Sequence, residues 1–221
     1  MELALLASLA VMAGVCLAMA LGPEGGWDAA YYHLRLPKLY AMAHRVYLVA
    51  YLFPSHYPQN VEMLYTAGWL LGGESAAKLV NLSFWFLCGA ALWRISLPLG
   101  GRTALRAVAL ALTMPLAGVL ASENYVDLGL TFLELTALAE LLARRPAAAG
   151  VLLGMAMGVK YTGLVSFVAA AAVLWSSGRG VRSVAAMALG ALVPLVPWLV
   201  KNALFTGDPA APFLSRILGR L

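Results

Sequence analysis

The chain has 221 residues, of which 62% are hydrophobic and 11% are charged. Its mean hydropathy of +0.84 lies well above that of soluble globular domains and predicts an all-α polytopic membrane protein. The net charge of +5 does not predict nucleic-acid binding, because the arginines fall between apolar segments rather than along one face. Cys16 and Cys88 lie inside apolar segments, so the sequence indicates neither a disulfide framework nor a cysteine metal site.

Apolar runs between charges predict about seven membrane segments within a single domain, residues 1–221. They cover 3–22, 77–97, 104–121, 128–143, 147–158, 162–176 and 184–200. The first segment lacks a preceding basic region, so we expect an uncleaved helix rather than a signal peptide. The segments 147–158 and 162–176 are short for a hydrocarbon core about 30 Å thick. They predict a hairpin of partial helices with Lys160 at its tip.

The arginines predict the sidedness of the chain. Those in the short loops of one side make it cytoplasmic by the positive-inside rule; they are Arg94, Arg102, Arg106, Arg144, Arg145, Arg179 and Arg182. The extracytoplasmic face then holds residues 23–76, the Glu123–Asp127 turn, Lys160 and a tail at 201–221. All nine tyrosines lie on that face, seven of them within residues 31–65, and an interfacial aromatic belt does not explain this concentration.

The first outer loop, residues 23–76, is predicted to form amphipathic helices on the outer leaflet, interrupted by Pro37, Pro54 and Pro58. A helix that begins at Asp28 would place Asp28, Tyr32 and Arg35 on one face. We expect Pro37 to end or kink this helix. Two interpretations of Asp28 stay open: it caps the helix by accepting backbone N–H bonds, or it is a functional acid.

Six segments, taken together and in order, resemble the GT-C superfamily of polytopic glycosyltransferases, and most closely its bacterial Rgt-like or mannosyltransferase-like branch. They are DAAYYHLRLPKLY (28–40), YPQNVEMLY (57–65), GGESAAKL (72–79), ENYVDLGL (123–130), GMAMGVKYTGL (154–164) and PWLVKNALFTGDPAAPF (197–213). The resemblance implies a cell-envelope hexosyltransferase in the bacterial cytoplasmic membrane, with its active site facing the periplasm. Its expected partners are the bilayer, a polyprenyl-phosphate sugar donor and a glycan, lipid or protein acceptor.

The chain departs from the family pattern in two ways. Lys201 and Asp208 stand where the resemblance leads us to expect Arg and Asn. Members of the superfamily usually continue through several more membrane helices. We therefore expect a short family member, an N-terminal portion, or one half of an enzyme that a second chain completes.

The resemblance implies an inverting reaction in which an acceptor hydroxyl attacks the anomeric carbon and the lipid phosphate leaves. Asp28 matches the family's acid in the first outer loop and is our candidate general base, because the attacking hydroxyl must lose a proton. Asp127 either caps the next helix or acts as a second catalytic acid. With Glu123 it would orient the acceptor, or with Asp28 it would hold Mg²⁺ or Ca²⁺, which prefer oxygen ligands.

The leaving phosphate requires positive charge or hydrogen-bond donors. Lys160 either binds this anion or snorkels to the interface from the hairpin tip, and Lys201 is a second candidate. Arg35 and Lys38 contact either substrate or lipid headgroups. The full set of candidate substrate-binding residues is Tyr32, His33, Arg35, Lys38, Glu62, Glu123, Lys160, Tyr161 and Lys201.

Two other functions stay open. In the first, the chain is a catalytically incomplete GT-C-like accessory subunit. In the second, it is a small transporter or lipid-handling permease. In a transporter Lys160 and the intramembrane acid Glu134 would line a pathway. The concentration of acids and tyrosines on the outer face favours the enzyme and the accessory subunit over the transporter.

Overall fold

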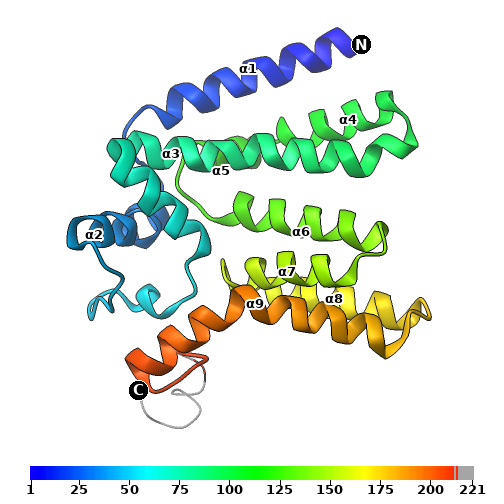
Figure 1. The fold of residues 1–221 in the computed structure, drawn as a ribbon. Helices are drawn as coiled ribbons and strands as arrows, with labels where there is room; N and C mark the ends of the chain where they lie inside the picture. The colour runs from blue at the N-terminus through cyan, green and yellow to red at the C-terminus, as the bar shows by residue number, and fades with distance from the viewer. Residues whose placement is uncertain (212, 214–221) are drawn as a thin grey trace. The chain divides into compact units, whose positions relative to one another are not determined.

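The computed structural model describes residues 1–211 and 213 (Figure 1). All regular elements in this part of the chain are helical, which confirms the predicted all-α class. They are α1 (Glu2–Ala20), the π-helix η1 (Ala29–His33), α2 (Arg35–Ala43), η2 (Phe53–His56), α3 (Asn60–Ser96), η3 (Leu97–Leu99), α4 (Gly101–Leu112), α5 (Pro115–Ser122), α6 (Asp127–Leu142), α7 (Pro146–Met157), α8 (Gly163–Ser176) and α9 (Gly180–Thr206). The helices form two compact units: unit 1 comprises residues 1–45 and 61–135, and unit 2 comprises 46–60 and 136–221.

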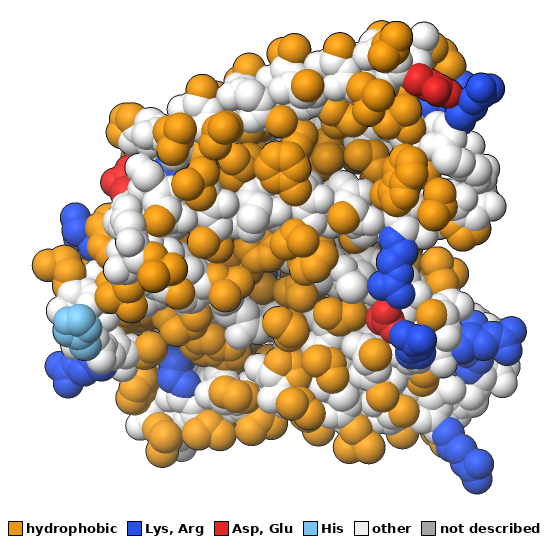
Figure 2. Space-filling model, turned by 45° about the horizontal axis from the view of Figure 1, so that its top comes forward, with side chains coloured by type: hydrophobic (Ala, Val, Ile, Leu, Met, Phe, Trp, Pro, Cys, Tyr) orange, Lys and Arg blue, Asp and Glu red, His pale blue; other side chains and the backbone are white. Residues whose placement is uncertain are grey.

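Three of the described helical stretches are long and apolar enough to cross a membrane: α1, α3 continued through η3, and α9. The bent pair of α4 and α5 makes a fourth if it counts as one span, and α7 and α8 are shorter apolar helices. Hydrophobic side chains cover most of the face of the molecule that Figure 2 presents, as expected of a protein in contact with lipid. The structure thus supports a membrane protein with three or four spans, and the predicted seven are not confirmed.

The segment predicted at 104–121 as one helix is two helices, α4 and α5, that meet at 66°. The break has a local cause, because Pro115 has no N–H to continue the helix and disfavours helical backbone at the residue before it. Met114 is accordingly extended, with φ −61° and ψ 133°. Pro115 then takes the first position of α5, where its fixed φ suits a helix start.

The first outer loop also differs from its prediction. The helix α3 begins at Asn60, well inside the predicted loop, and continues through a kink at Gly72 and Gly73. Gly73 has φ +68°, a conformation that costs glycine little and other residues more. Pro37 neither ends nor kinks a helix, because it lies in the first turn of α2, where the missing N–H has no helical acceptor.

In unit 2, α7 and α9 approach closely through small residues, which let helix backbones come near one another. A Cβ atom added to Gly150 would overlap the backbone of Met187, and one added to Gly154 would overlap the backbone of Ala191. The predicted helical hairpin is present as α7 and α8, with Lys160 in the turn between them. The tail predicted from Lys201 begins later, because α9 continues to Thr206, and part of that tail, residues 212 and 214–221, lies outside the described residues.

Candidate acid site of unit 1

Acidic residues gather where α1 ends. At the start of α1 the Glu2 carboxylate lies 2.9 Å from the Nε atom of Arg102 at the start of α4. After the last turn of α1 the chain enters a region that we call the acid end, formed by Glu24, Asp28, Glu74, Glu123 and Asp127. Which end faces the cytoplasm stays a prediction.

A buried lysine fixes the chain where α1 ends and the first outer loop begins. The Lys78 ammonium group donates to the carbonyl oxygens of Met19 at 3.1 Å, Gly22 at 3.0 Å and Pro23 at 3.1 Å. The side chain is only 1% exposed, and these three bonds match the three donors of an ammonium group. The positive charge also lies at the negative end of the α1 dipole. Lys78 therefore anchors the segment that leads to Asp28.

A carboxylate joins this segment to the turn before α6. One oxygen of Glu24 accepts hydrogen bonds from the backbone N–H groups of Gly25 at 3.0 Å and Gly26 at 2.9 Å. The other oxygen accepts from the backbone N–H of Asn124 at 2.9 Å. The Glu74 carboxylate accepts from the backbone N–H of Glu24 itself at 2.7 Å. The chain before Asp28 and the chain before Asp127 are thus held by one side chain.

Two polar side chains of α3, Tyr65 and Asn81, form hydrogen bonds with the same turn. The Tyr65 hydroxyl lies 2.8 Å from the Asn81 side-chain oxygen and 2.6 Å from the carbonyl oxygen of Tyr125. The Asn81 amide donates to the carbonyl oxygens of Leu120, at 2.8 Å, and Glu123. Tyr65 and Asn81 are fully buried, and these bonds satisfy their polar groups while joining α3 to the turn before α6.

Asp28 does not act as a helix cap. It immediately precedes η1, but its side chain makes no capping hydrogen bond and is exposed. Its charge acts instead on the neighbouring Tyr125 phenol. Burial raises the pKa of Tyr125, and the carboxylates of Glu123, Asp28 and Glu24 raise it further. Carboxylates from two separate segments therefore act on the same phenol.

The acids also affect one another. Burial raises the pKa of the Glu123 carboxyl, the Glu24 carboxylate raises it further, and Lys78 lowers it. Asp127 is the first residue of α6 and is half-buried. Both candidate catalytic acids thus belong to the acid end of unit 1.

His33 and Glu62 are 29 positions apart in the sequence and come together in the turn that follows Asp28. The His33 Nδ1 atom lies 2.7 Å from Glu62 Oε1, and both side chains are 3% exposed. The Tyr32 and His33 ring centroids are 3.8 Å apart. The second oxygen of Glu62 is buried and has no hydrogen-bond partner among the described residues. This pair anchors η1 on α3.

The remaining candidates of unit 1 lie on its surface. Arg35 and Lys38 are exposed on α2, and the Lys38 ammonium group lies 5.5 Å from the centroid of the Trp69 ring. This geometry is that of a cation–π contact. Glu134 is half-buried on α6.

Lys160, Tyr161 and Lys201 belong to unit 2. The Lys201 ammonium group donates to the carbonyl oxygens of Ser55 at 2.9 Å and Tyr57 at 3.0 Å, and it lies 5.2 Å from the Trp198 ring centroid. The Tyr161 hydroxyl donates to the carbonyl oxygen of Ala211 at 2.6 Å. Lys160 is half-buried in the α7–α8 turn. Lys201 therefore anchors the segment around η2.

The residues that build the acid end were only partly visible in the sequence. Lys78 had a readable signal, because a lysine inside an apolar run is costly unless it is paired. Glu24, Asn81 and Asn124 had none, because their partners are backbone groups of distant segments that no sequence pattern identifies.

Among the described residues, no group of three or more His, Cys, Asp or Glu side chains is placed to hold a metal ion. The assignment of Asp28 and Asp127 as ligands of Mg²⁺ or Ca²⁺ stays a prediction, because Mg²⁺ keeps several waters and takes only one or two carboxylates from the protein. In comparisons with known proteins, no family model, curated protein or solved structure matches the chain.

Proposed function

We propose that the chain is a membrane glycosyltransferase that moves a sugar from a polyprenyl-phosphate donor to an acceptor hydroxyl at the outer face of a bacterial cytoplasmic membrane. The placement of Asp28 supports this proposal most directly. Its carboxylate is exposed, makes no capping hydrogen bond and follows a segment that Glu24 and Lys78 hold in place. A positioned carboxylate with no structural task of its own suits a general base.

In the proposed reaction the acceptor hydroxyl attacks the anomeric carbon and transfers its proton to the Asp28 carboxylate. The bond between the anomeric carbon and the phosphate oxygen breaks, the lipid phosphate leaves, and the sugar configuration inverts. Asp127 and Glu123 would accept hydrogen bonds from the other hydroxyl groups of the acceptor. Tyr32 and Tyr125 offer flat aromatic surfaces beside the acids for a sugar ring.

Lys160 belongs to unit 2, and its contact with the leaving phosphate stays a prediction from the sequence, where a cation would stabilise the charge that develops as the bond breaks. Lys201 is the second candidate, and its bonds to the carbonyl groups of Ser55 and Tyr57 limit how far it can move. Each step of the proposed reaction is assigned to the chain's own side chains.

The decisive experiment compares the wild-type chain with Asp28→Asn in bilayers that contain polyprenyl-phosphate sugars. We expect the substitution to lower the rate of sugar transfer by about 10²–10⁴-fold, the usual contribution of a general base. Glu2→Gln is the matched control, because Glu2 lies at the opposite end of unit 1 in an exposed pair with Arg102, and it should leave the rate unchanged.

Equal rates for the wild type and Asp28→Asn would remove Asp28 as the base. No transfer by the wild type with any of a panel of donors and acceptors would overturn the enzyme proposal. That outcome would favour the accessory subunit instead.

A further inference from the structure

Four arginines lie on two turns at one end of unit 2. Arg144 and Arg145 are in the turn between α6 and α7, and Arg179 and Arg182 are at the start of α9. The Arg179 guanidinium group donates to the carbonyl oxygen of Leu141 at 3.0 Å, and the backbone N–H of Arg144 lies 3.1 Å from the same oxygen. This shared acceptor holds the two turns together (Figure 1). We call the four exposed arginines the arginine patch.

The positive charge of the patch is only partly offset. Residues 140–146 and 176–183 contain these four arginines and a single acid, Glu140. The Glu140 carboxylate lies 3.5 Å from the guanidinium group of Arg145 and offsets one charge. The surface therefore suits a ligand that carries negative charge.

The backbone at Arg144 indicates that this residue is kept for its side chain. Both α6 and α8 end with the same pair of backbone hydrogen bonds, a motif in which the residue beyond the helix has a positive φ. In α8 that residue is Gly178, with φ +72°. In α6 it is Arg144, with φ +60°, a conformation that costs a residue with a Cβ atom more than it costs glycine. A charged side chain thus occupies a position where glycine is the more stable choice, as is common at functional sites.

The patch lies at the end of a candidate membrane span. The helix α9 is long and apolar enough to cross a bilayer, and Arg182 is in its first turn. Large apolar side chains close to the arginines in the chain are exposed: Trp175 at 66%, Val181 at 66% and Leu142 at 63%. Exposed tryptophan and arginine side chains together are typical of the bilayer interface, where the ring meets lipid and the charge meets headgroups. A soluble anion would not cover these apolar side chains.

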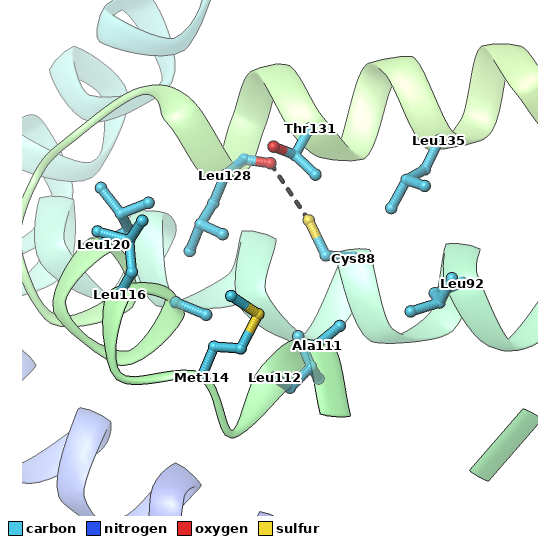
Figure 3. Close-up of a pocket in the computed structure, with 11 residues that line it drawn as sticks. Cys88, Leu92, Ala111, Leu112, Met114, Leu116, Leu120, Leu128, Thr131 and Leu135 are labelled. Atoms are coloured by element: carbon cyan, nitrogen blue, oxygen red, sulfur yellow. Dashed lines mark hydrogen bonds between the residues drawn. The ribbon is translucent and has the colours of Figure 1, made fainter. Parts of the chain in front are cut away.

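The apolar hollow of unit 1 does not suit a negatively charged ligand. Its walls come from α3, α6 and the bend between α4 and α5, and none of its described lining residues is charged (Figure 3). The Cys88 thiol donates to the carbonyl oxygen of Leu128 at 3.3 Å, and the Thr131 hydroxyl donates to that of Asp127 at 2.8 Å. An anion in the hollow would lose its hydration without gaining a charged partner.

We propose that the arginine patch binds the phosphate groups of anionic phospholipids in the leaflet that it faces. Guanidinium groups bind phosphate oxygens through paired hydrogen bonds, and Arg144 and Arg179 supply such groups from both turns. The bound lipids hold the α6–α7 and α8–α9 turns at the membrane surface. This inference does not depend on the proposed enzymatic activity, because none of the four arginines has a part in it.

The test measures lipid binding to the full-length chain in detergent, by native mass spectrometry with phosphatidylglycerol or phosphatidylcholine. We expect the wild type to bind phosphatidylglycerol more tightly than phosphatidylcholine. The double variant Arg144→Gly/Arg182→Gln should bind phosphatidylglycerol about 30-fold more weakly, or about 5-fold for each arginine. Its affinity for phosphatidylcholine should not change. Equal affinity of the wild type for the two lipids would overturn the proposal.

The double variant Arg102→Gln/Arg106→Gln is the matched control. Both arginines are exposed on α4 of unit 1, so their loss removes the same amount of charge outside the patch. This variant should keep the wild-type affinity for phosphatidylglycerol. An equal loss of affinity in both double variants would mean that net charge alone attracts the lipid, and the patch would not be the site. Displacement of the lipid by glycerol phosphate at equal concentration would assign the patch to a soluble anion and contradict the proposal.

The single variant Arg144→Gly separates the charge of the patch from its folding. Glycine adopts φ +60° at little cost, so we expect the melting temperature to stay unchanged or to rise. The affinity for phosphatidylglycerol should nevertheless fall about 5-fold. A lower melting temperature with unchanged lipid affinity would show that Arg144 has a structural task instead, and would remove it from the lipid site.

Discussion

The Nδ1 atom of His33 lies 2.7 Å from the Oε1 atom of Glu62, and each side chain is only 3% exposed. The contact joins η1, the turn that follows Asp28, to the first part of α3. The buried second oxygen of Glu62 has no hydrogen-bond partner among the described residues. Loss of either residue therefore leaves the other as a buried polar group without its hydrogen-bond partner.

We expect His33→Ala and Glu62→Ala each to lower the free energy of unfolding by about 3–5 kcal/mol, as for other buried pairs that lose one partner. Unfolding in detergent, followed by circular dichroism, measures the change. The double variant should cost clearly less than the sum of the two single variants, because the residues are in contact. Glu2→Ala, which breaks the exposed pair with Arg102, should cost about 0–1 kcal/mol. Strict additivity of His33→Ala and Glu62→Ala would contradict the pairing.

Lys78 and Glu24 should together control the order of the segment before Asp28. Lys78→Met leaves three carbonyl groups without their donor, at a cost of about 1–3 kcal/mol for each one that stays buried and unsatisfied. Glu24→Ala removes the acceptor shared by Gly25, Gly26 and Asn124. Hydrogen exchange measured by mass spectrometry should therefore rise in residues 22–28 for both variants.

The two variants should differ at the turn before α6. Glu24→Ala should also raise the exchange of residues 123–127, because Glu24 bonds directly to Asn124. Lys38→Met is the control, since Lys38 lies on the exposed face of α2 and contacts Trp69 rather than this loop. If Glu24→Ala raises hydrogen exchange in residues 22–28 alone, Glu24 does not hold the two segments together.

The sequence predicted helix positions well and helix breaks poorly. Apolar runs located α1, α6, α7 and α8 to within a few residues, because length and hydropathy govern membrane helices directly. The bend at Met114 was missed although Pro115 was visible, since a proline inside an apolar run is also tolerated, as Pro194 is within α9. The position of a proline alone does not decide between these outcomes.

The candidate site, like the fold, could be predicted from the sequence only in part. Asp28 and Asp127 are conspicuous in the sequence because charged residues stand out next to apolar segments, and their catalytic role stays a prediction. The capping interpretation of Asp28 could be judged only from the geometry of η1. The Glu24 clamp depends on two segments that are 100 positions apart in the sequence, and composition carries no information about such a contact.

The close packing of α7 against α9 gives a prediction about glycines. Gly150→Ala and Gly154→Ala should each destabilise unit 2, because the added methyl group would meet the backbone of Met187 or Ala191 and force the helices apart. We expect about 1–3 kcal/mol for each, as for overpacked cores. Gly14→Ala is the matched control, since a Cβ there has no neighbour within 4 Å, and it should stabilise α1 by about 0.5–1 kcal/mol. Similar effects at all three positions would mean that helix propensity, not contact, determines the result.

Tyr161 should make the stability of unit 2 depend on alkaline pH. Burial raises the pKa of its phenol to about 12, the nearby charge of Asp208 and the Tyr57 ring raise it, and a hydrogen bond from Asn202 lowers it. The unfolded phenol titrates near its ordinary value of 10.0. Because the folded state retains the proton that the unfolded state loses, the contribution of Tyr161 is complete below the unfolded pKa. It is lost as the pH rises toward the folded value.

Ultraviolet titration of tyrosinate checks this directly. The late ionisation near pH 12 should be smaller by one tyrosine in Tyr161→Phe than in the wild type, and the free energy of unfolding should fall less steeply with rising alkaline pH in that variant. Tyr51→Phe is the matched control, because Tyr51 is 65% exposed, and it should keep the late ionisation. If Tyr161→Phe retains that phase in full, another tyrosine is responsible and the bond from Tyr161 to Ala211 does not shield the phenol from solvent.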